Sequence, residues 1–281
     1  MIVKDLEAAR KILPSLNIAV DNSRLDDFLA RAQQWVSQRI IGKDIEELLD
    51  AEVQGQDPYA ELRVLVQRVI AEQAYLTASS ELDVQLSEAG FVVQSNDYMK
   101  PAFDGRVDRL CQSLRDRVKT DADNLVGYLF KNPDSLSEIA DWKTTEQFTY
   151  LSQAFCLYTY EVEGFAGEQF DMYNVFLMMQ PKIGEALRIN VARYVSLAEV
   201  ERLIELFRDG ELLSDHKIAI ARLKYSAVAY ARGNKMMGDY WASNARFFMK
   251  KNISFFPAFA ASEEFNEPGD TIDHGQIANF L

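Results

Sequence analysis

The stretch DPYAELRVLVQRVIAEQAYL, residues 57–76, decides the fold class. Asp57 followed by Pro58 is typical of a helix start. The Asp side chain can cap the helix, and proline suits the first helical position, where a backbone N–H would have no partner within the helix. Apolar residues then recur at intervals of three and four, on one helix face: Leu62, Leu65, Val66, Val69 and Ile70. The pattern predicts a long amphipathic helix with one side buried in a helical core.

Helical spacing continues on both sides of this stretch. It runs through residues 25–39 and through the segments that follow Pro101, Pro181 and Ser214. Ser196 with Glu199 forms a candidate capping box, which marks another helix start. Between residues 82 and 94 the period changes to two, and Gly90 offers a turn, which predicts a β-hairpin. We therefore expect a mainly α protein: a multi-helix bundle with a small β-hairpin insertion and an extended C-terminal arm.

Three regions follow from these patterns. We expect an N-terminal helical region over residues 1–140, which includes the hairpin, and a C-terminal helical region over residues 141–254. Residues 255–281 show no periodicity and are expected to form the extended arm. In each helical region a helix is followed by a short helix, an acidic break and a long helix. A divergent duplication and a chance recurrence of helical hairpins both explain this order.

Composition excludes several functional classes. The net charge is −13, with 43 acidic against 30 basic residues, which argues against sequence-specific DNA or RNA binding. No stretch approaches the roughly 20 apolar residues of a membrane span. The two cysteines, Cys111 and Cys156, form no disulfide framework, so a reduced environment is the simple interpretation. The charged N-terminus has no apolar signal core, and we expect it to be unprocessed.

A search for catalytic residues yields weak candidates. The two histidines, His216 and His274, lack the context of a catalytic triad or a metal motif, and we expect both to be solvated. The acidic pairs Glu161–Glu163 and Glu201–Glu205 could bind a divalent cation, but a solvated helix face explains them better. We therefore expect no enzymatic activity, no cofactor and no metal site.

Aromatic residues suggest contacts with other subunits. They crowd residues 142–176, where most are expected in the core and some at a subunit interface. Apolar residues are also spaced through the polar C-terminal arm, as in a strap that lies on a neighbour. The side chains that we expect to contact another subunit or partner are Phe170, Tyr173, Phe176, Phe255, Phe256, Phe259, Phe265 and Phe280.

Residues 82–114 carry a family resemblance. Gly90-Phe91-Val92-Val93-Gln94-Ser95-Asn96 is followed by Pro101-Ala102 and by the basic segment Arg106-Val107-Asp108-Arg109-Leu110. This order resembles an uncharacterised family of Bacteroidota phages and prophages, whose members combine a glycine-containing hairpin, a Pro-Ala pair and an Arg-rich helix. The family resemblance implies a virion neck protein, a head–tail connector or adaptor, with no catalytic residues to carry over.

The resemblance also implies partners and a location. It points to a homo-oligomeric ring beneath the portal, with twelve subunits as one candidate number, in contact with portal and tail or neck proteins. DNA would pass through the lumen of such a ring, and the virion would be assembled in the host cytoplasm. The alternatives are a bacterial cytoplasmic helical interaction module without a virion role and an enzyme that uses carboxylate-bound Mg²⁺.

Overall fold

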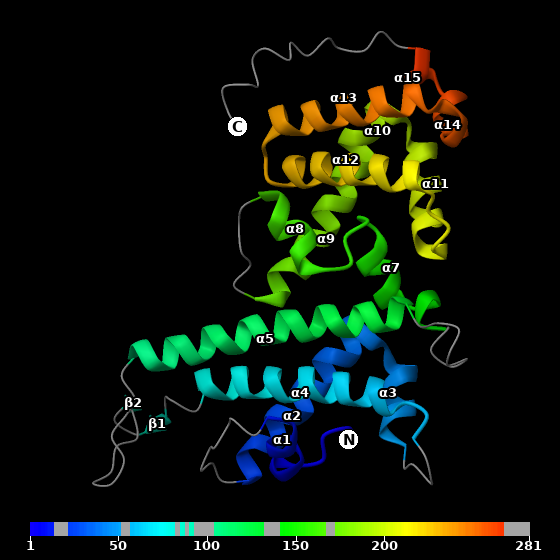
Figure 1. Ribbon diagram of the computed structural model, residues 1–281. Helices are drawn as coiled ribbons and strands as arrows, with labels where there is room; N and C mark the ends of the chain where they lie inside the picture. The colour runs from blue at the N-terminus through cyan, green and yellow to red at the C-terminus, as the bar shows by residue number, and fades with distance from the viewer. Residues whose placement is uncertain are drawn as a thin grey trace. The chain divides into compact units, whose positions relative to one another are not determined.

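The computed structural model describes residues 1–13, 22–51, 57–81, 85–87, 90–92, 104–131, 141–166 and 172–266 (Figure 1). Within these residues the protein is mainly helical, as expected. The chain divides into two compact units. Unit 1 comprises Met1–Phe148 and Phe170–Tyr173, and unit 2 comprises Thr149–Gln169 and Asn174–Leu281. None of the described helices combines the length and the apolar character that a membrane crossing requires.

Unit 1 is built around two long helices, α4 and α5, that lie side by side (Figure 1). Helix α2 packs against α4, and α1 also contacts α4. The elements of this unit are α1 (Leu6–Ile12), α2 (Asn22–Val36), the π-helix η1 (Ser37–Ile41), α3 (Lys43–Asp50), α4 (Ala60–Glu81), β1 (Gln85–Ser87), β2 (Gly90–Val92), α5 (Asp104–Lys131) and the 3₁₀ helix η2 (Asp141–Thr144).

The predicted helix after Asp57 is confirmed. It begins at Ala60, and the Asp57 carboxylate accepts a hydrogen bond from the Tyr59 amide at 2.9 Å. Four of its five predicted core residues, Leu62, Val66, Val69 and Ile70, are fully buried, and Leu65 is half-buried. Burial of each large apolar side chain stabilises the fold by about 1.5–3 kcal/mol, so this face is the main attachment of α4 to its neighbours.

A short antiparallel ladder lies within the region where the sequence predicts a hairpin. Strand β1 pairs with β2, with Leu86 opposite Phe91 and Ser87 opposite Gly90. Three residues per strand leave the protein in the mainly α class. The other residues of segment 82–94 lie outside the described residues, so the larger predicted hairpin stays a prediction.

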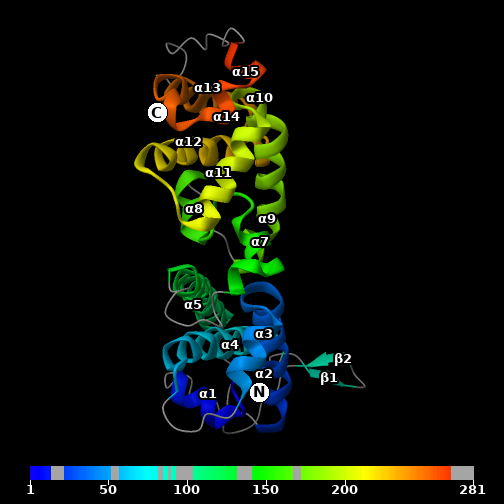
Figure 2. The same ribbon diagram turned by 90° about the vertical axis from the view of Figure 1, so that its right-hand side faces the viewer.

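Unit 2 is a second helical assembly, in which α12 and α13 lie side by side, as Figures 1 and 2 both show. Its elements are α8 (Thr159–Ala166), the π-helix η3 (Leu187–Val191), α10 (Ala192–Val195), α11 (Leu197–Asp209), α12 (Ser214–Ala231), α13 (Lys235–Lys251), the 3₁₀ helix η4 (Ile253–Phe255), α14 (Pro257–Ala260) and α15 (Glu263–Asn266). Two more helices, α7 (Glu146–Ser152) and α9 (Tyr173–Ala186), start in unit 1 and continue into unit 2.

Pro181 lies inside α9 and does not begin a helix, which corrects the expectation from the sequence. A proline in a helix interior leaves the carbonyl four residues earlier without its amide donor. That carbonyl belongs to Leu177, and the Tyr150 hydroxyl donates a hydrogen bond to it at 2.6 Å. A side chain of α7 therefore satisfies the group that the proline cannot, and the helix continues through Pro181.

The two units share a local pattern that bears on the possible duplication. In each, a helix passes into one π-helical turn, and a residue with positive φ precedes the next long segment of helix. This residue follows η1 directly in unit 1, and it follows η3 after the four-residue helix α10 in unit 2. That residue is Gly42 in unit 1 (φ 81°) and Ser196 in unit 2 (φ 68°). Helices α3 and α4 follow in one unit, and α11 and α12 in the other. The recurrence in the same order favours duplication over chance.

The described part of the predicted arm is folded, not extended. Residues 255–266 include the end of η4, all of α14 and all of α15, and α14 packs against α11. The prediction of an extended arm is therefore wrong for these residues. Single turns of this kind show too little periodicity to be recognised in the sequence. The remainder of the arm, residues 267–281, lies outside the described residues.

Candidate functional site

Four of the predicted contact residues come together at the end of unit 2. Phe256 and Phe259 are fully buried, whereas Phe255 is 36% exposed and Phe265 is half-buried. The Phe259 and Phe265 rings meet edge to face, with centroids 5.5 Å apart. Phe256 and Phe259 therefore belong to the core of their own unit, and in this conformation they offer no surface to another subunit.

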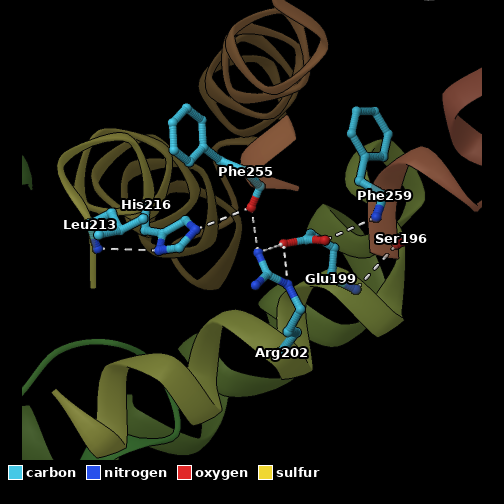
Figure 3. A network of polar contacts seen from close by, with 7 residues as sticks. All are labelled: Ser196, Glu199, Arg202, Leu213, His216, Phe255 and Phe259. Atoms are coloured by element: carbon cyan, nitrogen blue, oxygen red, sulfur yellow. Dashed lines mark hydrogen bonds and ion pairs between the residues drawn. The ribbon is translucent and has the colours of Figure 1, made fainter. Parts of the chain in front are cut away.

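A buried carboxylate holds this segment in place (Figure 3). Glu199, in the first turn of α11, has no exposed surface. One of its oxygens, Oε1, accepts hydrogen bonds from Arg202 Nε at 2.9 Å and Nη2 at 2.6 Å, and Oε2 accepts one from the Phe259 amide at 2.9 Å. Arg202 Nη2 also donates to the Phe255 carbonyl at 2.7 Å. The ion pair thus binds backbone groups on both sides of Phe256.

The start of α11 confirms half of the predicted capping box. The Ser196 hydroxyl accepts a hydrogen bond from the Glu199 amide at 3.2 Å, as an N-cap should. In a complete capping box the Glu side chain would return to the backbone of Ser196. Here it turns instead toward Arg202 and Phe259. The sequence therefore locates the helix start and misses the second role of the carboxylate.

His216 completes the network and corrects the expectation that it is solvated (Figure 3). The side chain is buried, and Nδ1 accepts a hydrogen bond from the Leu213 amide at 3.3 Å. Nε2 lies 3.1 Å from the Phe255 carbonyl. Because an amide faces Nδ1 and a carbonyl faces Nε2, the arrangement selects the neutral ring with its proton on Nε2. The imidazole bridges α12 to the η4 turn.

The polar groups of the Glu199–Arg202–His216 network, called the clamp below, stabilise the fold of their own unit. Each of the three side chains bonds to a backbone group of Phe255 or Phe259. The charged oxygens of Glu199, Nη2 of Arg202 and Nε2 of His216 therefore all have hydrogen-bond partners within the chain. This arrangement fastens η4 and α14 to α11 and α12.

The predicted contact residues near the start of α9 are also internal where they are described. Tyr173 is buried, and its ring meets Trp35 edge to face at 5.9 Å. Burial raises the pKa of the Tyr173 hydroxyl above its usual value. Phe176 is fully buried in unit 2. Phe170 and Phe280 lie outside the described residues, so their predicted contacts stay predictions.

The expected solvated carboxylates are more engaged than the sequence indicated. Glu161 accepts hydrogen bonds from the Leu157 and Tyr158 amides at 2.7 and 3.1 Å, and from Lys224 Nζ at 2.6 Å. Glu201 pairs with Arg188 at 2.7 Å. Among the described residues, no group of three or more His, Cys, Asp or Glu side chains is placed to hold a metal ion.

One acidic pair in unit 1 was not anticipated. Glu72 on α4 is buried and hydrogen-bonds to Asp121 on α5. Burial, with the negative charge and the hydrogen bond of Asp121, raises the pKa of Glu72 to about 8, against the opposing effect of Arg117 and Arg68. The carboxyl group is therefore protonated near neutral pH and shares its proton with a carboxylate. No sequence signal marks this pair, because it is formed between two helices.

An open surface pocket of about 580 Å³ lies next to this pair. Its lining residues are Arg109, Gln112, Ser113, Asp116, Arg117, Thr120 and Asp121. All of them belong to α5, so among the described residues the pocket has one polar wall and no converging groups from a second element. Small-molecule sites usually enclose their ligand and combine an apolar lining with a few converging polar groups. The acid pair is better explained as a helix–helix contact than as a catalytic dyad.

The comparisons with known proteins concern unit 1. No curated protein and no solved structure matches the chain significantly. Residues 15–152 match the model of a family of unknown function (DUF6712). The match spans α2 to α5 and ends at the last residue of α7, just after the end of the main segment of unit 1. Over residues 15–152 the chain is thus similar to DUF6712, a family of unknown function.

Proposed function

We propose that this protein is a non-catalytic structural subunit of a bacteriophage virion, a head–tail connector that forms a homo-oligomeric ring beneath the portal. Support for the phage role comes from the resemblance of residues 82–114 to a phage and prophage family. The mainly helical architecture suits an adaptor ring, and the net charge of −13 suits a lumen that DNA passes without binding. Portal, tail and neck proteins are the proposed partners, and the virion neck is the proposed location.

The proposal that the subunit is non-catalytic rests on the hydrogen bonds that its buried polar side chains make. In the clamp, a carboxylate, a guanidinium and an imidazole all bind backbone groups of the same short segment. An active site would direct at least one such group toward a cavity. Here all three stabilise the fold, which is the expected use in a protein whose function lies in its surfaces.

Native mass spectrometry tests the proposal directly. The protein alone, and mixed with a candidate portal protein from the same genome, should give a ring-sized oligomer or a complex with the portal ring. A strict monomer with no affinity for any neck protein would refute the connector role. A stable complex with a host protein, and none with virion proteins, would favour the alternative of a bacterial interaction module.

Protein composition of purified virions provides a second, independent readout. A connector is present in a fixed, small number of copies per particle. We therefore expect peptides of this chain in mature particles at a constant ratio to the portal protein. Their absence from purified particles would contradict a structural role in the virion.

A further inference from the structure

The helical hairpin α12–α13 has a positive net charge, whereas the rest of the protein is strongly negative. Residues 214–251 contain eight Lys and Arg and two Asp, a net charge of +6. Because the whole chain has a net charge of −13, the remaining residues carry −19. These basic residues are scattered along two helices, so no run in the sequence reveals them. The pairing of α12 with α13 brings the two basic helices together, with Lys224 and Arg246 buried and the other six basic residues at least partly exposed.

The two helices have an inner and an outer side. Gly238, Ala242, Ala245 and Met249 form a buried stripe of α13, at intervals of three and four. Residues on other sides of the same helices meet across the hairpin. Tyr225 and Trp241 stack at 4.7 Å with an angle of 19°, and the Arg222 guanidinium lies 4.5 Å from the centroid of the Phe248 ring. We call this surface the hairpin face: Arg222, Tyr225, Trp241, Phe247, Phe248 and Lys251.

The hairpin face has the composition of a protein interface. Aromatic residues and Arg are enriched at the centre of such interfaces and supply most of their binding energy. Phe247 is 60% exposed, with the Lys251 ammonium 4.3 Å from its ring centroid. Arg222 is also held in place, because its Nη1 donates a hydrogen bond to the Asn244 carbonyl at 3.1 Å. Arg222 lies beside the half-buried Phe248 ring, and a cation that is already ordered loses little entropy when a partner binds.

We propose that the hairpin face binds the acidic surface of a second copy of this chain, an inference that rests on the proposed ring-forming function. Charge complementarity selects this occupant, because the rest of each copy carries −19. The same charges disfavour contact between two hairpin faces, since the charged residues of each face, Arg222 and Lys251, are both basic and the surrounding helical hairpin has a net positive charge. The contact is therefore heterologous, and heterologous contacts that close generate rings, whereas self-complementary faces generate dimers.

The test compares two double variants that are matched in chemistry and spacing. Phe247→Ser with Lys251→Glu changes two exposed residues four positions apart on α13. Met178→Ser with Lys182→Glu makes the same kinds of change, four positions apart on α9, where Met178 is 69% exposed and Lys182 is also exposed. Sedimentation velocity over a range of concentrations, at low and high salt, gives the oligomer dissociation constant of each protein.

We expect the α13 variant to weaken assembly by about tenfold or more, as for an interface centre, and the α9 variant by less than about threefold. High salt should weaken wild-type assembly, because the contact is electrostatic. If the wild type forms rings and the α13 variant forms them equally well, the hairpin face is not the contact, although the ring function stands. If the wild type stays monomeric alone and with neck proteins, the ring function itself fails.

A nucleic acid is the other class of acidic partner. Binding measurements with the wild type and the two double variants distinguish it from a second copy of the chain. Basic and aromatic residues together also suit single-stranded DNA. Fluorescence anisotropy with a labelled oligonucleotide should show no binding in the micromolar range for wild type. Micromolar binding that the α13 variant loses and the α9 variant keeps would overturn the proposal and assign the hairpin face to nucleic acid.

Discussion

Replacement of Glu72 by Gln should change the stability of unit 1 in a manner that depends on pH. Glu72 is buried against Asp121, and its pKa is raised to about 8 in the folded protein from an ordinary value of 4.5. Between these two values the folded state keeps a proton that the unfolded state releases. The stability that this proton provides is complete below pH 4.5 and is lost as the pH rises through 8.

The size of the effect follows from the same two values. The free energy of unfolding should fall by about 1.4 kcal/mol per pH unit over most of this window, to a total of at most about 5 kcal/mol. Gln resembles the protonated Glu72 in shape and has no proton to lose. The Glu72→Gln variant should therefore lack this slope, and it should exceed wild type in stability by several kcal/mol at pH 8.5.

The assay must report unit 1 separately from unit 2. Urea unfolding with pulse hydrogen exchange and mass spectrometry does so, because peptides from α4 and α5 are read individually. Glu61→Gln, on the exposed side of the first turn of α4, is the matched control and should change stability by less than about 0.5 kcal/mol at every pH. A difference between Glu72→Gln and wild type that stays constant from pH 5 to 8.5 would refute the reasoning.

Three further predictions concern unit 2. Tyr150→Phe removes the donor to the Leu177 carbonyl and should destabilise the unit by about 1–3 kcal/mol, measured by urea unfolding. Gly238→Ala places a methyl group 2.8 Å from the Tyr230 ring and should cost about 1–3 kcal/mol in the same assay, despite the better helix propensity of Ala. Glu199→Gln weakens the clamp and should speed hydrogen exchange of the amides in residues 255–260 by tenfold or more.

Each of these changes has a control elsewhere in the chain. Tyr160→Phe alters a largely exposed tyrosine, and Glu201→Gln alters a half-exposed carboxylate on α11; both should be nearly neutral. Gly105→Ala adds a methyl group with no atom within 4 Å and should stabilise α5 by up to about 1 kcal/mol. Equal effects of Gly105→Ala and Gly238→Ala, or of Tyr150→Phe and Tyr160→Phe, would contradict the contacts described.

Local features of the sequence predict the structure where the cause is itself local. The helix after Asp57 is confirmed because its apolar spacing and its start signal lie within 20 residues. The end of α11 at Asp209 has a local cause as well, since the next residue, Gly210, adopts φ 78° as a left-handed cap. In both places the side chain and the backbone group that it serves are neighbours in the chain.

Features that depend on distant residues could not be predicted. Pro181 reads as a helix breaker because the compensating hydroxyl of Tyr150 is 31 residues away in the sequence. His216 reads as solvated because its partner, the Phe255 carbonyl, is separated from it by 39 residues. The candidate sites share this property: the clamp, the Glu72 pair and the hairpin face each combine residues from separate helices.

The π-helical turns η1 and η3 carry a consequence for the history of the protein. A π-helical turn closes its hydrogen bond over five residues instead of four, as when the Gly42 amide bonds to the Ser37 carbonyl at 2.9 Å. Each such turn therefore accommodates one residue more than an α-helix of the same length. If the two units descend from one ancestor, that single-residue insertion was already present before the gene doubled. A single-unit homologue that is related to both halves should then carry the same extra residue in the helix that precedes its positive-φ position.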